Sequence, residues 1–174
     1  MPPTLRVLSL SVLAIWLGAS VFLTFGVGPA MFSNEVLQIV PRYHAGRIAQ
    51  VMLQSFFWFQ LGCGIGAVLL LLAEWAYLAR APRGWSIAIL VALMGLVLAG
   101  GLGIQPRLRQ LHQTMYAPDT TPEEKQRATQ SFRRWHGVSQ VGNLFLLLGV
   151  TVYFVQLAYP RTSGPKMKYP VGYF

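Results

Sequence analysis

The chain has 174 residues, of which 54% are hydrophobic and 11% are charged. Soluble domains usually carry about 25% charged residues, so the composition favours a protein whose solvent is mostly lipid. The net charge is +9, and the basic residues stand at the ends of apolar segments, as they do beside anionic headgroups. No motif that interleaves aromatic and basic residues accompanies them. We therefore expect a membrane protein that does not bind nucleic acid.

Four charge-free apolar stretches dominate the chain, and each is long enough to cross a bilayer as a helix of about 20 residues. They are Val7–Met31, Ile48–Ala73, Gly84–Pro106 and Trp135–Pro160. We predict an all-α fold: an integral membrane four-helix bundle with helical extensions beyond one membrane face. The membrane domain covers residues 1–160, and a tail rich in Pro, Gly and Lys covers residues 161–174.

The first apolar stretch resembles a secretory signal at its start, because Arg6 precedes it and Gly18-Ala19-Ser20 imitates a cleavage site. Its apolar run is too long for such a signal, so we interpret it as a first membrane helix. We expect that helix to end near Pro29, since proline disfavours helix in the preceding residue. The next segment, Phe32–Arg47, reads as an interfacial helix or loop.

Small residues recur every four positions in the second and third stretches, a spacing that lets helix backbones approach closely in lipid. The pattern predicts that these positions line helix contacts: Gly62, Gly66, Gly95 and Ala99. The connection between the two stretches, Arg80–Gly84, is so short that they must form an antiparallel hairpin.

The hydrophilic segment from Arg107 to Arg134 contains a strong helix start. Thr121 and Glu124 form the two halves of a capping box, and Pro122 suits the first helical position. A helix from there to Pro160 would be roughly 57 Å long at 1.5 Å per residue. That length exceeds a bilayer, so its first turns should project into water. The stretch Arg107–Tyr116 extends the third helix in the same way.

A polar stripe marks the start of the last helix, where His136, Ser139, Gln140 and Asn143 share one face. Exposing such a face to lipid is costly, so we expect it to point into the bundle or at a partner. Gln50 and Gln54 are candidate neighbours. Hydrogen bonds between helices are one interpretation, and a pocket for a quinone or pigment is another.

All three histidines lie near one membrane face, and imidazoles from facing helices can ligate a heme or a metal. Ordinary hydrogen bonding at the interface is the other interpretation, because no HxxxH or Glu-x-x-His spacing is present. The candidate cofactor-binding residues are His136, Gln140, Asn143, His112 and His44. Heme, quinone and chlorophyll are the candidate cofactors.

Enzymatic chemistry is not indicated by the sequence. Of the five acidic residues only Glu74 lies near an apolar segment, and pairing with Arg80 or Arg83 explains it. The chain has no Gly-rich phosphate loop, nucleophile elbow or zinc spacing. A transporter is disfavoured because ion-coupled carriers place ionisable groups or broken helices near the midplane.

Several short motifs resemble one family in their order and spacing. They are Trp16-Leu17-Gly18 through Phe25 followed by Gly28-Pro29-Ala30-Met31-Phe32, then Ala45-Gly46-Arg47, Ile104-Gln105-Pro106-Arg107, and Trp135-His136-Gly137-Val138-Ser139 followed by Asn143-Leu144. This set resembles the four-span domain of unknown function typified by eukaryotic transmembrane protein 205. The resemblance implies the four-helix fold, and it assigns no activity, cofactor or partner to any residue.

The sequence therefore favours a non-enzymatic protein that contacts membrane lipid and other membrane protein subunits, as an accessory or scaffolding subunit of a larger complex. A cofactor-binding protein is the alternative, and a small transporter is third. We expect a bacterial inner (cytoplasmic) membrane, with both termini on the same side. Arg6 directly precedes the first span and favours a cytoplasmic terminal side, although that side has six basic residues and the other eight.

Overall fold

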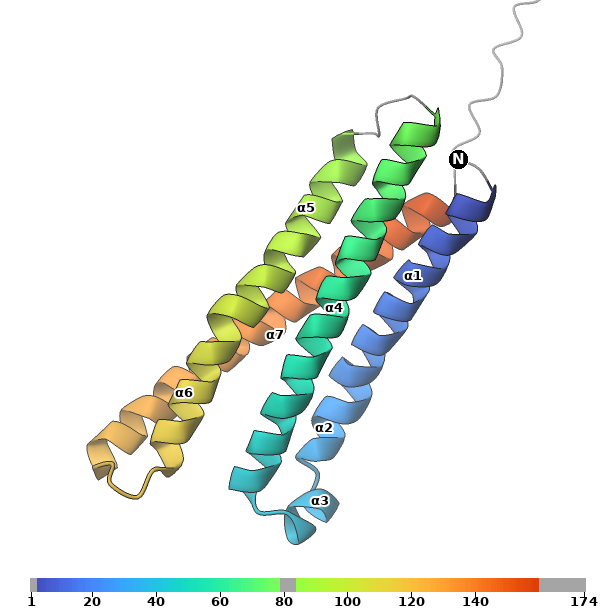
Figure 1. Ribbon diagram of the computed structural model, residues 1–174. Coiled ribbons are helices and arrows are strands. Elements are labelled where there is room, and N and C mark those ends of the chain that lie inside the picture. Colours follow the sequence, from blue (N-terminus) through green and yellow to red (C-terminus); the bar gives the residue numbers. More distant parts are fainter. Residues whose placement is uncertain (1–2, 79–83, 160–174) are drawn as a thin grey trace, which may run out of the picture.

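The computed structural model describes residues 3–78 and 84–159, and these form a bundle of long helices without strands (Figure 1). Four segments are long and apolar enough to cross a membrane, which confirms the predicted fold class. Residues 79–83 and the tail lie outside the described residues. The elements are α1 (Pro3–Val21), η1 (Phe22–Val27), α2 (Gly28–Met31), α3 (Asn34–Ile39), α4 (Arg42–Leu78), α5 (Gly84–Leu98), η2 (Ala99–Ile104), α6 (Gln105–Tyr116) and α7 (Pro122–Ala158).

The first and third spans each pass through a wide π-helical turn just before a proline. Gly28 N–H donates to the Leu23 carbonyl after η1, and Gln105 N–H donates to the Gly100 carbonyl after η2, so each bond reaches back five residues. Proline lacks an N–H, and its ring clashes with the carbonyl four residues before it. The wide turn moves that carbonyl away. The first span ends at Met31, which agrees with the predicted end near Pro29, but the proline itself does not stop the helix, because the helix continues through α2.

The helices extend beyond the predicted apolar stretches at one end of the bundle. α4 begins at Arg42, six residues before the apolar run, and α6 continues η2 through Tyr116. The capping box of α7 is confirmed: Thr121 N–H donates to Glu124 Oε2 at 3.1 Å, and Glu124 N–H donates to Thr121 Oγ1 at 3.3 Å. The Thr121 N–H and the Thr121 hydroxyl both donate to the Glu124 carboxylate, and these two bonds hold its pKa below the usual value.

The four spans meet in one apolar core that runs along the bundle. Trp16 of α1 is fully buried and lies against Gly64 of α4, where a side chain would collide with Met94 of α5. Lipid tails are as apolar as leucine, so close packing rather than the hydrophobic effect holds such helices together. The core residues are Leu13, Trp16, Phe57, Ala67, Leu90, Leu93, Val97, Leu146, Val150 and Tyr153.

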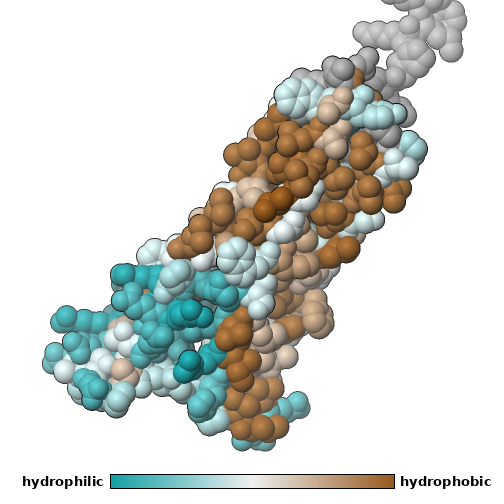
Figure 2. Space-filling model, viewed as in Figure 1, coloured by the Kyte–Doolittle hydropathy of each residue, from teal (hydrophilic) through white to brown (hydrophobic). Residues whose placement is uncertain are grey.

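We infer the membrane boundaries from exposed tryptophan rings, because tryptophan prefers the headgroup level of a bilayer. Trp75 and Trp85 lie near one end of the spans, and Trp58 lies toward the other end. Trp58 and Trp75 are 17 residues apart, or about 26 Å along the helix, close to the roughly 30 Å of a bilayer core. Trp135 of α7 is exposed further toward the hydrophilic end than Trp58, because its neighbour Phe132 contacts His112, which lies against Gly46 of α4. Beyond that boundary, α6 and the start of α7 form the hydrophilic end of the molecule, which contrasts with the apolar band over the spans (Figure 2).

Candidate functional site

His112 is the only histidine that the fold buries. It lies on α6, outside the membrane-spanning part of that helix, with 5% of its surface exposed. Its ring stacks on Tyr43 of α4 at 5.7 Å between centroids and packs against Tyr116 and Phe132. Burial, with the positive charge of Arg47, lowers the pKa of His112 below its usual value. Its Nδ1 atom has no hydrogen-bond partner within the described part of the chain.

The other two histidines do not join His112 in a common pocket. His136 is exposed on α7 and stacks on Phe132 at 5.9 Å, so the Phe132 ring contacts both His112 and His136. His44 is exposed on α4 beside Tyr43. Within residues 3–78 and 84–159, no group of three or more His, Cys, Asp or Glu side chains is placed to hold a metal ion.

The polar stripe of α7 does not turn inward as a whole. Asn143 does: its Nδ2 donates to Thr24 Oγ1 of η1 at 2.8 Å, and Thr24 Oγ1 donates in turn to the Ser20 carbonyl at 2.7 Å. His136 and Gln140 are exposed. The stripe lies partly at the membrane boundary, where water and headgroups satisfy polar groups, so only its deepest member needs a protein partner.

Gln50 and Gln54 do not pair with this stripe, contrary to the sequence-based expectation. Both residues contact α6 instead. Gln105 Nε2 donates to the backbone carbonyl of Gln50 at 3.4 Å, and Gln54 lines a cleft with α6. The reason is geometric, because the short α4–α5 hairpin places span three, and hence α6, directly beside α4.

The predicted small-residue contacts are wrong at most of the positions. Gly62, Gly95 and Ala99 are exposed, and a Cβ on Gly62 or Gly95 would meet nothing within 4 Å. Gly66 alone makes an ordinary contact, with Val12 of α1 at 3.7 Å. The glycines that permit close packing are Gly46, Gly64, Gly101 and Gly149. They share no common spacing, so sequence spacing could not find them.

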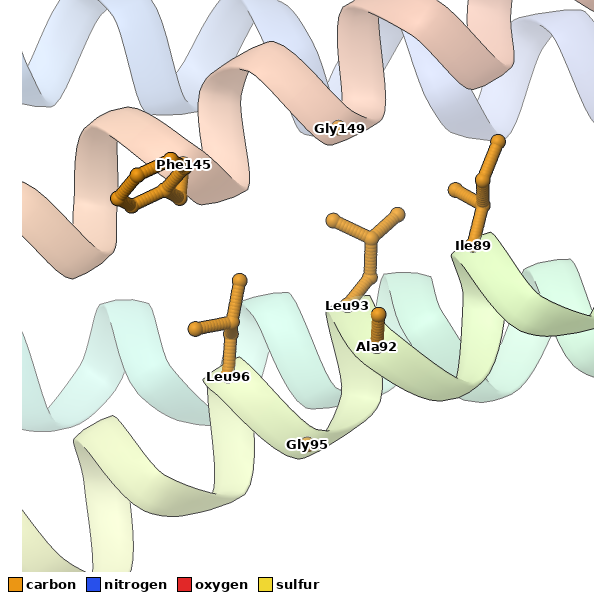
Figure 3. Close-up of a pocket in the computed structure, with 7 residues that line it drawn as sticks. All are labelled: Ile89, Ala92, Leu93, Gly95, Leu96, Phe145 and Gly149. Atoms are coloured by element: carbon orange, nitrogen blue, oxygen red, sulfur yellow. The ribbon is translucent and has the colours of Figure 1, made fainter.

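An apolar groove of about 550 Å³ separates α5 from α7 within the membrane band (Figure 3). Leu93 projects from α5 toward Gly149 of α7, and a Cβ on Gly149 would lie 2.8 Å from Leu93. Among the residues that the structure describes, no polar side chain lines the groove. Its residues are Ile89, Ala92, Leu93, Gly95, Leu96, Phe145 and Gly149.

Beside the groove, the outer face of the third span carries an uninterrupted line of small residues, all exposed. They are Ala88, Ala92, Gly95, Ala99 and Gly103. Two of them, Ala92 and Gly95, also line the groove. The regular spacing seen in the sequence thus describes an outward face and not a contact inside the bundle.

A second, polar cleft of about 150 Å³ lies between α4 and α6 at the hydrophilic end. Five polar side chains and one proline line it, and none of them is acidic. They are Gln54, Gln105, Pro106, Arg109, Gln110 and Gln113.

At the opposite end of the bundle, Arg6 links the first helix, α1, to the last helix, α7. Its Nη2 donates to the Ala158 carbonyl of α7 at 2.7 Å, which places a cation at the negative end of the helix dipole. Residues 3 and 158 therefore lie at the same end of the bundle. Arg80 and Arg83, which the sequence proposed as partners of Glu74, lie outside the described residues.

The chain matches a known protein family. A family model described as a domain of unknown function, DUF4149, matches residues 11–117, which is more than half of the chain. The chain belongs to the DUF4149 family. The match includes most of the first span, the second and third spans and α6, and with them the α5 wall of the groove and the whole polar cleft. No curated protein and no solved structure matches the chain.

Proposed function

We propose that this DUF4149 protein is a non-enzymatic accessory or scaffolding subunit that docks a transmembrane helix of another protein against α5. The observation that carries the proposal is the apolar groove and the exposed small-residue face that borders it. Neither is covered by residues 3–78 or 84–159 of the chain.

The shape of this face is better suited to packing against another helix than to contact with lipid alone. Helices associate in lipid by close van der Waals packing, and small residues let the two backbones approach. Gly95 has open space where a Cβ would stand. The larger side chains of Leu96 and Phe145 form the rim of the groove (Figure 3). A neighbouring helix could seat one or two side chains between them.

Photo-crosslinking in native membranes tests the proposal. A photoreactive residue at Ala92 should give one discrete protein adduct heavier than the monomer, and mass spectrometry of the adduct should identify a membrane-embedded segment of a different protein. Gly95→Leu should abolish the adduct, because the leucine side chain would fill the space through which the partner helix approaches. The isolated bundle should keep its thermal stability.

Gly62→Leu is the matched control, because Gly62 is also an exposed glycine with open space around it but lies on α4, away from the groove. It should leave the adduct unchanged. Adducts to lipid alone would refute a protein partner. An adduct between tagged and untagged copies of this chain would replace the accessory role with a homo-oligomer.

The heme, quinone or chlorophyll alternative receives no support from a shared pocket, since His136, Gln140, Asn143, His112 and His44 point to different surroundings. We further propose residence in a bacterial inner membrane with both termini in the cytoplasm, and kinship with the transmembrane protein 205 family. The fourth-helix motif of that resemblance lies beyond residue 117, outside the matched region.

A further inference from the structure

We propose that the polar cleft between α4 and α6 binds the phosphate group of a membrane phospholipid. The proposal is independent of the accessory role, because it concerns a different surface and a different ligand. It rests on where the cleft lies, what lines it and what is missing from its lining.

We place the cleft at the depth of the lipid headgroups. Gln54 stands one helical turn beyond Trp58, an exposed ring of the type that prefers the headgroup level. Gln105 is the first residue of α6, directly after the apolar turns of η2. Both sides of the cleft therefore leave the hydrocarbon at the same level, where phosphate esters are the most abundant anions of a bilayer.

The lining supplies hydrogen-bond donors around one positive charge. Gln105, Arg109 and Gln113 are four residues apart, so they share one face of α6 and present it to Gln54 of α4. An arginine fork binds a phosphate through two parallel hydrogen bonds, and each glutamine amide adds donors. The bond from Gln105 to the Gln50 carbonyl holds one wall of the cleft in place.

The lining also lacks a competitor for that charge. No acidic residue lines the cleft, and α6 contains none. The volume of about 150 Å³ corresponds to roughly five water molecules. This space accommodates one phosphate group, while the acyl chains of its lipid can lie along the apolar helices below it. Basic pockets between membrane helices bind lipid phosphates in this way.

Native mass spectrometry of the purified full chain tests the site with two probes that have the same acyl chains, phosphatidylglycerol and diacylglycerol. The wild type should bind phosphatidylglycerol more tightly. Arg109→Ala should weaken that binding by about fivefold, the equivalent of the ~1 kcal/mol that one basic residue contributes at a membrane surface. Diacylglycerol binding should not change.

Arg107→Ala is the matched control, because Arg107 is exposed on the same helix two residues away and does not line the cleft. It should change phosphatidylglycerol binding by less than about twofold. Equal losses in the two variants would refute a defined site and leave only a general surface charge. So would equal affinity of the wild type for the two lipids.

A third measurement separates a lipid phosphate from a free one. A large excess of inorganic phosphate should fail to displace phosphatidylglycerol from the wild type, because the acyl chains contribute to binding. Displacement would assign the cleft to soluble phosphate and overturn the lipid proposal. Gln113→Leu guards against a folding artefact: it keeps every charge, removes one donor, and should weaken phosphatidylglycerol binding while the thermal unfolding temperature stays unchanged.

Discussion

Asn143 Nδ2 donates a hydrogen bond to Thr24 Oγ1 across 2.8 Å, joining the last span to the π-helical turn of the first. The Thr24 hydroxyl also donates to the Ser20 carbonyl, and the Ser20 hydroxyl donates to the Trp16 carbonyl. The wide turn η1 is thus held by polar contacts on the side that faces α7. Hydrocarbon offers no water for these groups, so each satisfies another.

We expect Asn143→Leu to destabilise the bundle only mildly, by about 0.6 kcal/mol, the average of such bonds between membrane helices. Thr24→Val should cost a similar amount, and the double variant should cost less than the sum. Unfolding in mixed detergent micelles measures this double-mutant cycle. Strict additivity of the two single variants would show that the bond contributes nothing. A loss of complex assembly in Asn143→Leu, with the isolated fold intact, would mark this residue as functional.

Gly101→Ala should destabilise the bundle by about 1–3 kcal/mol, the usual cost of overpacking a core. A Cβ at this buried position would enter the ring of Phe57 on α4. Gly103→Ala is the matched control in the same π-helical turn, since a Cβ there meets nothing within 4 Å. Thermal unfolding in detergent compares the two. Combining Gly101→Ala with Phe57→Leu should recover part of the loss, and equal stability of the two single variants would contradict the packing described above.

Lowering the pH should weaken the hydrophilic end of the bundle through His112. Its folded-state pKa lies below the ordinary value of 6.5, so the unfolded chain binds more protons as the pH falls. The stabilising contribution of neutral His112 is complete above pH 6.5. It is lost progressively as the pH falls from there toward the lowered folded-state pKa. Thermal unfolding of the wild type should therefore shift to lower temperature between pH 7.5 and 5.

The variant His112→Gln identifies the source of that shift. It removes the titrating ring from the contact with Tyr43 and Gly46 but retains His44 and His136, which are exposed. The pH dependence should become shallower in this variant. An unchanged pH profile would assign the effect to another group.

Reporter fusions test the orientation in the membrane. A reporter after Phe174 and one inserted at Ala117 should report opposite compartments, because an even number of spans separates the ends and the α6–α7 connection lies at the other end of the bundle. We expect the cytoplasmic signal from the fusion after Phe174, since Arg6 directly precedes the first span. An external signal there would reverse the orientation.

Length and apolar composition by themselves determined the number of spans and the helical class. Only a helix or closed barrel satisfies backbone polar groups in hydrocarbon, so four uncharged runs of this length allow few alternatives. The start of α7 was also predictable, because Thr121, Pro122 and Glu124 act within one turn of helix. The extensions beyond the bilayer followed from helix length alone.

Only the tertiary structure decided which face of each helix meets which neighbour. Helical periodicity places Gly62, Gly95 and Ala99 on regular faces, but it cannot say whether those faces look inward or outward. In water the apolar face of a helix turns inward, whereas in lipid both faces are apolar and that signal is lost. The partner of Asn143, the burial of His112 and the cleft around Arg109 depend on the rotation and crossing of whole helices. Contacts among residues far apart in the chain set these features.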